Sequence, residues 1–156
     1  MSYFLRNILP LSLCIFSGHT AAETFDFSYA FGDLHTISGS LDGSRTGQFI
    51  NGISNVSVFY DGVVMNGSPN MFVLGYSDAT NFDIAIPAVV SFDGALNNFM
   101  FIDSNDASGR SLFTNIFYML DTPTLSLAEA AGDAFFSNDR VFNPLTNAPQ
   151  WTLTRA

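Results

Sequence analysis

The chain has 156 residues, of which 14 are Asp or Glu and 5 are Lys or Arg, so the formal net charge is −9. All five basic residues are arginine, and so acidic a surface disfavours nucleic acid and anionic lipid, which bind to basic patches. The length is sufficient for one domain that buries its own hydrophobic core.

The first 22 residues predict a secretory signal peptide. Arg6 supplies a positive charge, an apolar run follows at 8–16, and small residues end at Ala22. A stable membrane span needs about twenty apolar residues, so this run is too short, and we expect cleavage after Ala22 and a secreted or periplasmic protein. A buried N-terminal helix and lipid attachment at Cys14 are the alternatives, although Leu13 is the wrong residue to precede a lipidated cysteine.

Cleavage would leave a single domain, residues 23–156, without cysteine. Its 14 acidic and 4 basic residues give a net charge of −10. Such a domain has no disulfide, no thiolate nucleophile and no cysteine-ligated metal. Small exported eukaryotic domains are often rich in disulfides, so this composition favours a bacterial protein.

Apolar and polar residues alternate along most of the remaining sequence, which is the period of a β-strand. The aromatic side chains of 25–31 line one face, and Ile37 and Leu41 continue the pattern after a turn at Gly32-Asp33, which predicts a first hairpin. Runs rich in Val, Ile, Phe, Tyr and Thr predict further strands. They lie at 49–50, 53–60, 63–65, 71–76, 82–86, 89–92, 99–102, 112–120, 141–142 and 151–154.

The turns and the centre of the sheet are also predicted. Asp-Gly pairs at 42–43, 61–62 and 93–94 are typical of hairpin turns, because both residues accept a positive φ. The segments 98–102 and 112–120 are apolar on both faces, so we expect a central hairpin whose polar loop spans 103–111.

One short helix is expected at 126–132, where Ser126 and Glu129 have the spacing of a capping box and Gly132 follows as a stop. The sequence therefore predicts an all-β protein, an antiparallel β-sandwich or jelly-roll-like fold with at most one short helix.

Four segments of the chain, at 27–31, 37–43, 91–99 and 151–153, together carry a resemblance. They resemble a group of small exported bacterial proteins, many of which carry a PEP-CTERM sorting tail. The group is mainly uncharacterised, so the resemblance implies export and a surface or matrix role but no activity. The chain departs from the group because no Pro-Glu-Pro box, apolar helix or basic cluster follows Trp151.

The sequence offers few groups for catalysis. His35 is the one histidine after the signal peptide, and no Gly-x-Ser-x-Gly motif accompanies it, so we expect it to be structural. Carboxylate pairs suited to glycoside hydrolysis are Asp103 with Asp106 and Glu129 with Asp133. We expect the protein not to be an enzyme.

Two binding sites are candidates. Asp103, Asn105 and Asp106 bring oxygen ligands suited to calcium into one loop, although Ala107 occupies a place where another oxygen is expected and a solvated turn is the alternative. Trp151 is the candidate platform on which a sugar stacks, with packing in the core as the alternative.

Export, the strand pattern and the lack of catalytic motifs together predict a non-catalytic protein of the cell surface, the extracellular matrix or adhesion. Its partners would be further copies of itself, joined at an exposed strand edge, or an extracellular polysaccharide. Two alternatives stay open: a carbohydrate-binding module, with or without calcium, and a small extracellular hydrolase.

Overall fold

The computed structural model describes residues 22–78, 81–83, 85–103, 115–121, 125–132, 135–142 and 150–156, so the expected signal peptide lies outside it apart from Ala22. Every regular element in these ranges is a β-strand. The strands are β1 (Glu23–Ala30), β2 (Thr36–Thr46), β3 (Phe49–Tyr60), β4 (Val63–Val64), β5 (Phe72–Asp78), β6 (Asn81–Asp83), β7 (Val90–Ser91), β8 (Asn98–Ile102), β9 (Ile116–Asp121), β10 (Leu125–Gly132), β11 (Phe135–Phe142) and β12 (Trp151–Arg155).

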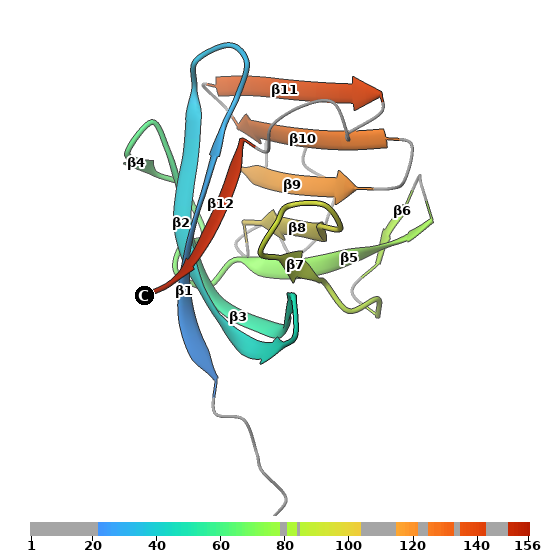
Figure 1. Ribbon diagram of the computed structural model, residues 1–156. Coiled ribbons are helices and arrows are strands. Elements are labelled where there is room, and N and C mark those ends of the chain that lie inside the picture. Colours follow the sequence, from blue (N-terminus) through green and yellow to red (C-terminus); the bar gives the residue numbers. More distant parts are fainter. Residues whose placement is uncertain are drawn as a thin grey trace, which may run out of the picture.

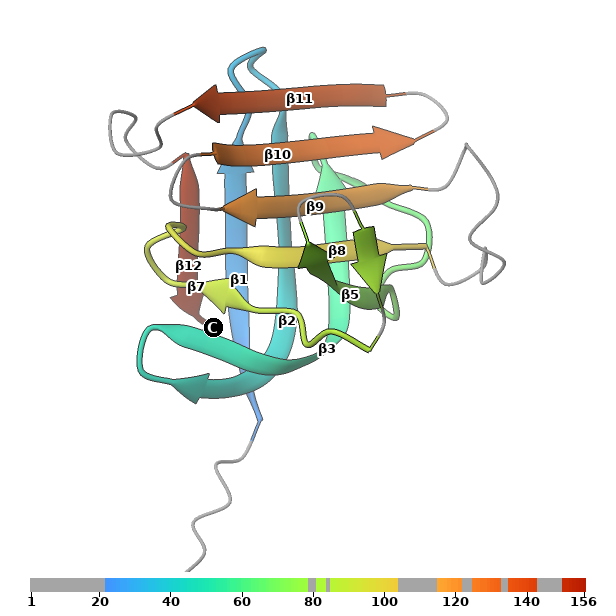
Figure 2. The same ribbon diagram turned by 90° about the vertical axis from the view of Figure 1, so that its right-hand side faces the viewer.

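The strands form two antiparallel sheets packed together, which confirms the predicted β-sandwich (Figure 1). Sheet A has the order β12-β1-β2-β3-β4, with β7 also paired to β3, and sheet B has the order β11-β10-β9-β8-β5-β6. Figure 2 shows the strands of sheet B running across those of sheet A behind them. The buried side chains lie between the two sheets.

The first hairpin forms where the alternation predicted it. Phe27 of β1 pairs with Gly39 of β2, and every second residue of β1 from Phe25 onward is buried. The chain reverses between the strands, where the backbone N–H of Phe31 donates to the carbonyl of His35 at 2.8 Å. The predicted turn at this position is confirmed.

Of the three Asp-Gly pairs, two form turns and one does not. Asp61 and Gly62 join β3 to β4 with φ values of 48° and 79°, and Gly94 has a φ of 68° in the turn after β7. The prediction of a turn at Asp42-Gly43 is wrong, because this pair lies within β2. Gly43 is needed there for close packing, since a Cβ would collide with the Cγ2 atom of Ile50.

The helix predicted at 126–132 is also wrong, because this segment is strand β10. It pairs with β9 on one side and with β11 on the other. Ala128 and Ala130 alternate with more exposed residues and are fully buried against the core. Hydrogen bonding on both edges and burial of one face outweigh a local capping pattern of four residues.

Phenylalanine dominates the core between the sheets. Phe25, Phe99, Phe101 and Phe117 are all inaccessible to solvent. Full burial of such a side chain contributes about 1.5–3 kcal/mol relative to exposure. Phe27 joins the sheets, because its ring lies 5.8 Å from that of Phe101 and 6.1 Å from that of Phe117.

The predicted central hairpin is confirmed for the residues that the structure describes. β8 pairs with β9 in the middle of sheet B, and Phe101 faces Phe117 across the pair. On the face away from sheet A these strands carry Met100, Tyr118 and Leu120, so both faces are apolar, as the sequence indicated.

In the part of the chain that the structure describes, no helix is long and apolar enough to cross a membrane.

Candidate binding site

Small polar side chains line the outer face of sheet A. Residues paired across neighbouring strands project to the same face, so the strand registers place these side chains in two rows from β12 to β3. We name this surface the hydroxyl face. One row is Thr154, Asp26, Ser40 and Ser57, and the other is Thr152, Ser28, Ser38 and Phe59.

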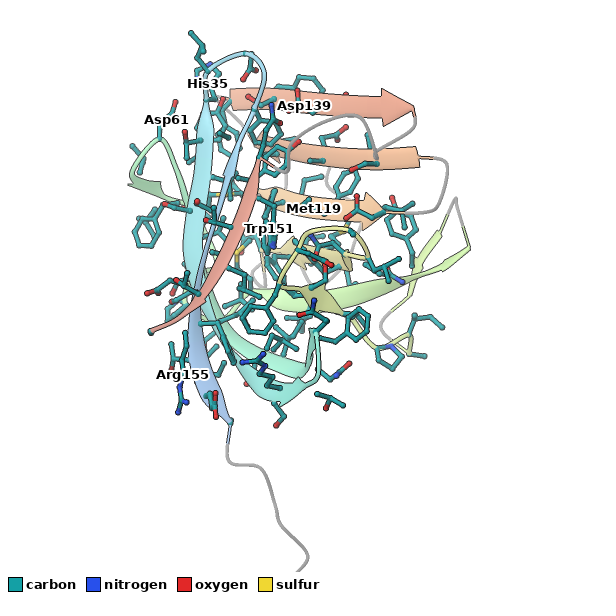
Figure 3. The ribbon with its side chains drawn as sticks, in the orientation of Figure 1. His35, Asp61, Met119, Asp139, Trp151 and Arg155 are labelled. Atoms are coloured by element: carbon teal, nitrogen blue, oxygen red, sulfur yellow. The ribbon has the colours of Figure 1, made fainter. Side chains whose placement is uncertain are left out.

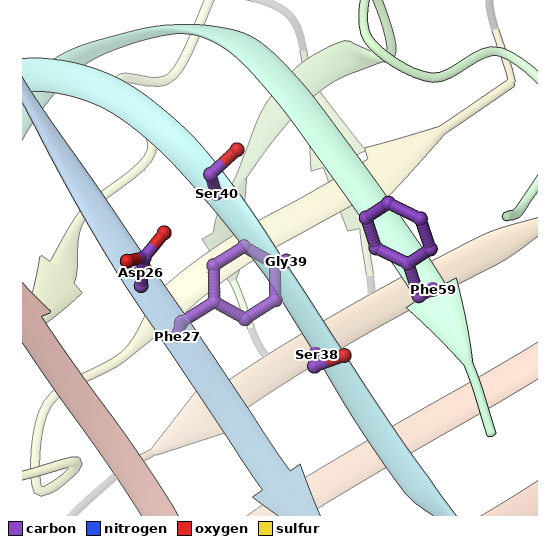
Figure 4. A pocket seen from close by; sticks show the side chains of 6 residues that line it. All are labelled: Asp26, Phe27, Ser38, Gly39, Ser40 and Phe59. Atoms are coloured by element: carbon purple, nitrogen blue, oxygen red, sulfur yellow. The ribbon is translucent and has the colours of Figure 1, made fainter. Parts of the chain in front are cut away.

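An open hollow lies in the middle of the hydroxyl face (Figure 4). Its centre is on β2, where Ser38 and Ser40 are short. Asp26 on β1 and Phe59 on β3 are larger and stand on opposite sides of the two serines. The hollow therefore has a carboxylate on one side, an aromatic ring on the other and hydroxyls between them.

The floor of the hollow is closed by the core. Gly39, between the two serines, has no side chain, and a Cβ there would lie 2.6 Å from Cζ of Phe27. The Phe27 ring thus packs against the inner side of β2 and is itself held by the rings of sheet B. A floor supported in this way positions the polar groups above it on a rigid element.

The polar groups of the hollow differ from their neighbours in their hydrogen bonding. Asp42 accepts hydrogen bonds from Asn55 Nδ2 and from Thr24 Oγ1, each at 2.7 Å, and these bonds hold the pKa of the Asp42 carboxyl below its usual value. Within the part of the chain that the structure describes, the side chains of Asp26 and Ser40 make no hydrogen bonds. Their hydrogen-bonding capacity is open to a ligand.

Trp151, the predicted sugar platform, lies inside the sandwich (Figure 3). Only 4 % of its surface is exposed, and its ring stacks on that of Phe27 at 5.6 Å. The indole Nε1–H donates to the carbonyl of Ser91 at 2.8 Å, and Gly94 packs directly against the ring. The structure therefore places Trp151 in the core, which is the alternative that its sequence left open.

The candidate calcium ligands fall mostly beyond the described ranges. Asn105 and Asp106 lie outside them, as does Asp133 of the second carboxylate pair. Asp103 is described and is buried at the end of β8, where its backbone N–H donates to the carbonyl of Asn115 at 3.0 Å. Among the described residues, no three His, Cys, Asp or Glu side chains gather closely enough to hold a metal ion.

His35 lies at one end of the molecule and is paired with Asp61 (Figure 3). Its Nδ1 atom is 2.6 Å from Oδ2 of Asp61, and Oδ1 of the same carboxylate accepts the backbone N–H of Thr36 at 2.8 Å. The Ser137 hydroxyl donates to Asp33 at 2.8 Å. In the described structure, no hydrogen bond joins Ser137 to His35. The geometry gives His35 a structural partner.

Stability should depend on pH through this pair. The hydrogen bond to Asp61 raises the pKa of His35 above its usual value, so the stabilisation is complete below the pKa of a free imidazole and is lost as the pH rises through the raised value. We expect His35→Gln to remove this component. Melting temperatures of both proteins between about pH 5 and pH 8 would check it, and an unchanged difference across that range would contradict it.

Sequence reasoning missed the hydroxyl face. The polar half of the alternating pattern contains Asp26, Ser28, Ser38 and Ser40, and no role was predicted for it. Nothing in the sequence states which strands become neighbours, so the two rows were not visible. A signal was present in the residue types, since serine and threonine outnumber charged residues at these positions.

Fold and site together define the class of protein: an all-β, two-sheet sandwich with a polar outer face and an open hollow on sheet A. Comparisons with known protein families, with curated proteins and with solved structures found no match. Sandwich folds serve many functions, so the fold does not indicate a function, and the residues of the hydroxyl face must do so.

Proposed function

We propose that the protein works outside the cytoplasm as a non-catalytic component of the cell surface or extracellular matrix, and that it adheres to its partner through the hydroxyl face. The observation that carries the proposal is the open hollow, in which the polar side chains of Asp26, Ser38 and Ser40 stand beside the Phe59 ring. The predicted signal peptide and the resemblance to exported bacterial proteins support the location.

The shape of the site favours adhesion. The hollow is open, and the rows continue on both sides of it across four strands, so an extended partner can make many shallow contacts at once. These side chains stand on paired strands, which lowers the entropy lost when they bind. Weak contacts that are repeated along a polymer together hold the protein on it more tightly than any single contact does.

Binding to the producing cells and their extracellular material tests the proposal. Residues 23–156 would be incubated with that material, sedimented and quantified in the bound fraction. Ser40→Leu fills the hollow with an apolar side chain, and we expect it to lower the bound fraction about tenfold. Asn138→Leu adds the same side chain at an exposed position of β11 in sheet B and serves as the matched control.

Equal binding by the Ser40→Leu variant and the original protein would show that the hydroxyl face is not the adhesive surface. Absence of the protein from the sedimented material would contradict the matrix role as well. Melting curves of both variants would establish that each is folded at the temperature of the assay.

A further inference from the structure

The hollow combines the two kinds of contact that a sugar needs. A pyranose ring presents hydroxyls around its rim, which exchange hydrogen bonds with carboxylates and hydroxyls, and C–H groups on its faces, which pack on aromatic rings. Asp26, Ser38 and Ser40 supply the polar contacts, and Phe59 supplies the apolar one from the far side of the hollow. Figure 4 shows the carboxylate and the Phe59 ring on opposite sides of the two serines.

The spacing of the strands suits a polymer better than a single sugar. Asp26, Ser40 and Ser57 are paired in sequence across β1, β2 and β3, so they repeat at the distance between neighbouring strands, about 4.8 Å. This repeat is comparable with the length of one pyranose residue in an extended chain. A glycan laid across the strands would meet one polar side chain for each sugar, and Phe59 stands beside this row, two residues after Ser57 on β3.

Charge narrows the class of polymer. The hydroxyl face carries the Asp26 carboxylate, Asp42 follows Ser40 two residues later on β2, and the predicted mature chain carries a net charge of −10, from 14 acidic and 4 basic residues. Two of the arginine side chains that the structure describes are engaged elsewhere: Arg45 lies 4.6 Å from the centre of the Phe92 ring, and Arg155 lies 3.4 Å from Glu23. An anionic polymer would be repelled. Ser and Thr hydroxyls outnumber the one carboxylate in the two rows, and hydroxyl side chains suit the hydroxyls of an uncharged polymer.

From these contacts we infer that the partner of the hydroxyl face is an uncharged polysaccharide, which lies across β1, β2 and β3 with one sugar ring against Phe59 and its hydroxyls bonded to Asp26, Ser38 and Ser40. The inference rests on the proposed function and gives the chemical class of the partner. It involves no covalent step.

Affinity electrophoresis in native gels tests the inference. The gels would contain hydroxyethylcellulose, laminarin or dextran as neutral glycans and alginate as an anionic one, each with and without calcium chloride. We expect at least one neutral glycan to retard residues 23–156 and alginate not to do so. Phe59→Ala and Asp26→Asn should each raise the dissociation constant about tenfold or more.

Matched controls lie on sheet B. Phe136→Ala removes an exposed phenylalanine from β11, and Glu129→Gln neutralises a carboxylate on β10, so both should bind as the original protein does. Asp26 is exposed, so its variant tests the surface even if Phe59→Ala proves unstable.

Three results would overturn the inference. They are retardation by alginate alone, retardation that survives both Phe59→Ala and Asp26→Asn, and no retardation by any neutral glycan. The protein could fail to be retarded by any neutral glycan and still sediment with extracellular material, while the Ser40→Leu variant does not sediment. In that case the adhesive role of the hydroxyl face would stand, and the inference that its partner is a neutral polysaccharide would be wrong. Loss of both kinds of binding would remove the proposed function itself.

Discussion

Replacing Trp151 by alanine should lower the free energy of unfolding by about 3–5 kcal/mol, the range for truncating a large buried aromatic side chain. The indole is enclosed by the rings of Phe27 and Phe99, whose centres lie 5.6 and 5.9 Å away. The substitution would empty this space and leave the carbonyl of Ser91 without its 2.8 Å hydrogen bond. Chemical denaturation of the variant and the original protein would measure the loss.

Two further variants make the Trp151 test specific. Trp151→Phe keeps a ring but removes the donor to Ser91, so it should cost less than alanine, about 1–3 kcal/mol. Phe136→Ala removes a ring that is 64 % exposed and should stay within about 0.5 kcal/mol of the original protein. A loss below about 1 kcal/mol for Trp151→Ala would mean that the indole is at the surface, and the role of a sugar platform would return to it.

Replacing Asp121 by asparagine should remove a large pH dependence of stability. Burial raises the pKa of Asp121 to about 6, and hydrogen bonds from Ser126 and from the backbone N–H of Asn97, at 3.1 Å, oppose that rise. The folded state therefore holds this proton more tightly than the unfolded state does. Between about pH 4 and pH 6, stability should fall as the pH rises, by on the order of 2–3 kcal/mol in total.

Asparagine suits the same site at every pH. Its carbonyl can accept from the Asn97 N–H, and its amide can donate to the Ser126 hydroxyl, so the geometry at position 121 is retained without a buried charge. We expect the variant to be the more stable protein above about pH 6 and to lose the advantage towards pH 4. Urea titrations across this range would measure the difference.

The comparison of the two proteins isolates Asp121 from the other titrating groups. Asp42 and Asp61 have lowered pKa values because of their hydrogen bonds, so their contribution is present above the ordinary carboxyl pKa and is lost in acid. Both groups are unchanged in the Asp121→Asn variant. A constant difference in stability between pH 4 and pH 8 would show that Asp121 titrates as an ordinary exposed carboxyl.

The proposed adhesion and the two stability predictions depend on the same packing. Phe27 closes the floor of the hollow and is stacked on Trp151, whose indole donates to Ser91 of β7. The Asp121 side chain in turn accepts the backbone N–H of Asn97, and the Asn97 side chain accepts the N–H of Ser91 at 2.8 Å. We expect a variant that loosens this core to weaken binding at the hydroxyl face as well.

The sequence by itself determined that the chain is built from strands and, along the alternating segments, which side chains are buried. Side chains on a strand alternate between two faces, so the Phe-rich half of segments such as 25–31 had to be buried and the polar half had to face outward. The turns at 32–33, 61–62 and 93–94 could be read in the same way, since each depends on a few neighbouring residues.

Tertiary structure decided the remainder, because it depends on contacts between distant residues. Segment 126–132 has a local helical pattern but forms a strand, because it pairs with a strand on each side. Gly43 packs on Ile50 where a turn was expected, and Trp151 is enclosed by rings from other strands. The hydroxyl face is the clearest case. Its rows exist only because β1 lies beside both β2 and the C-terminal β12, an order that no short segment encodes.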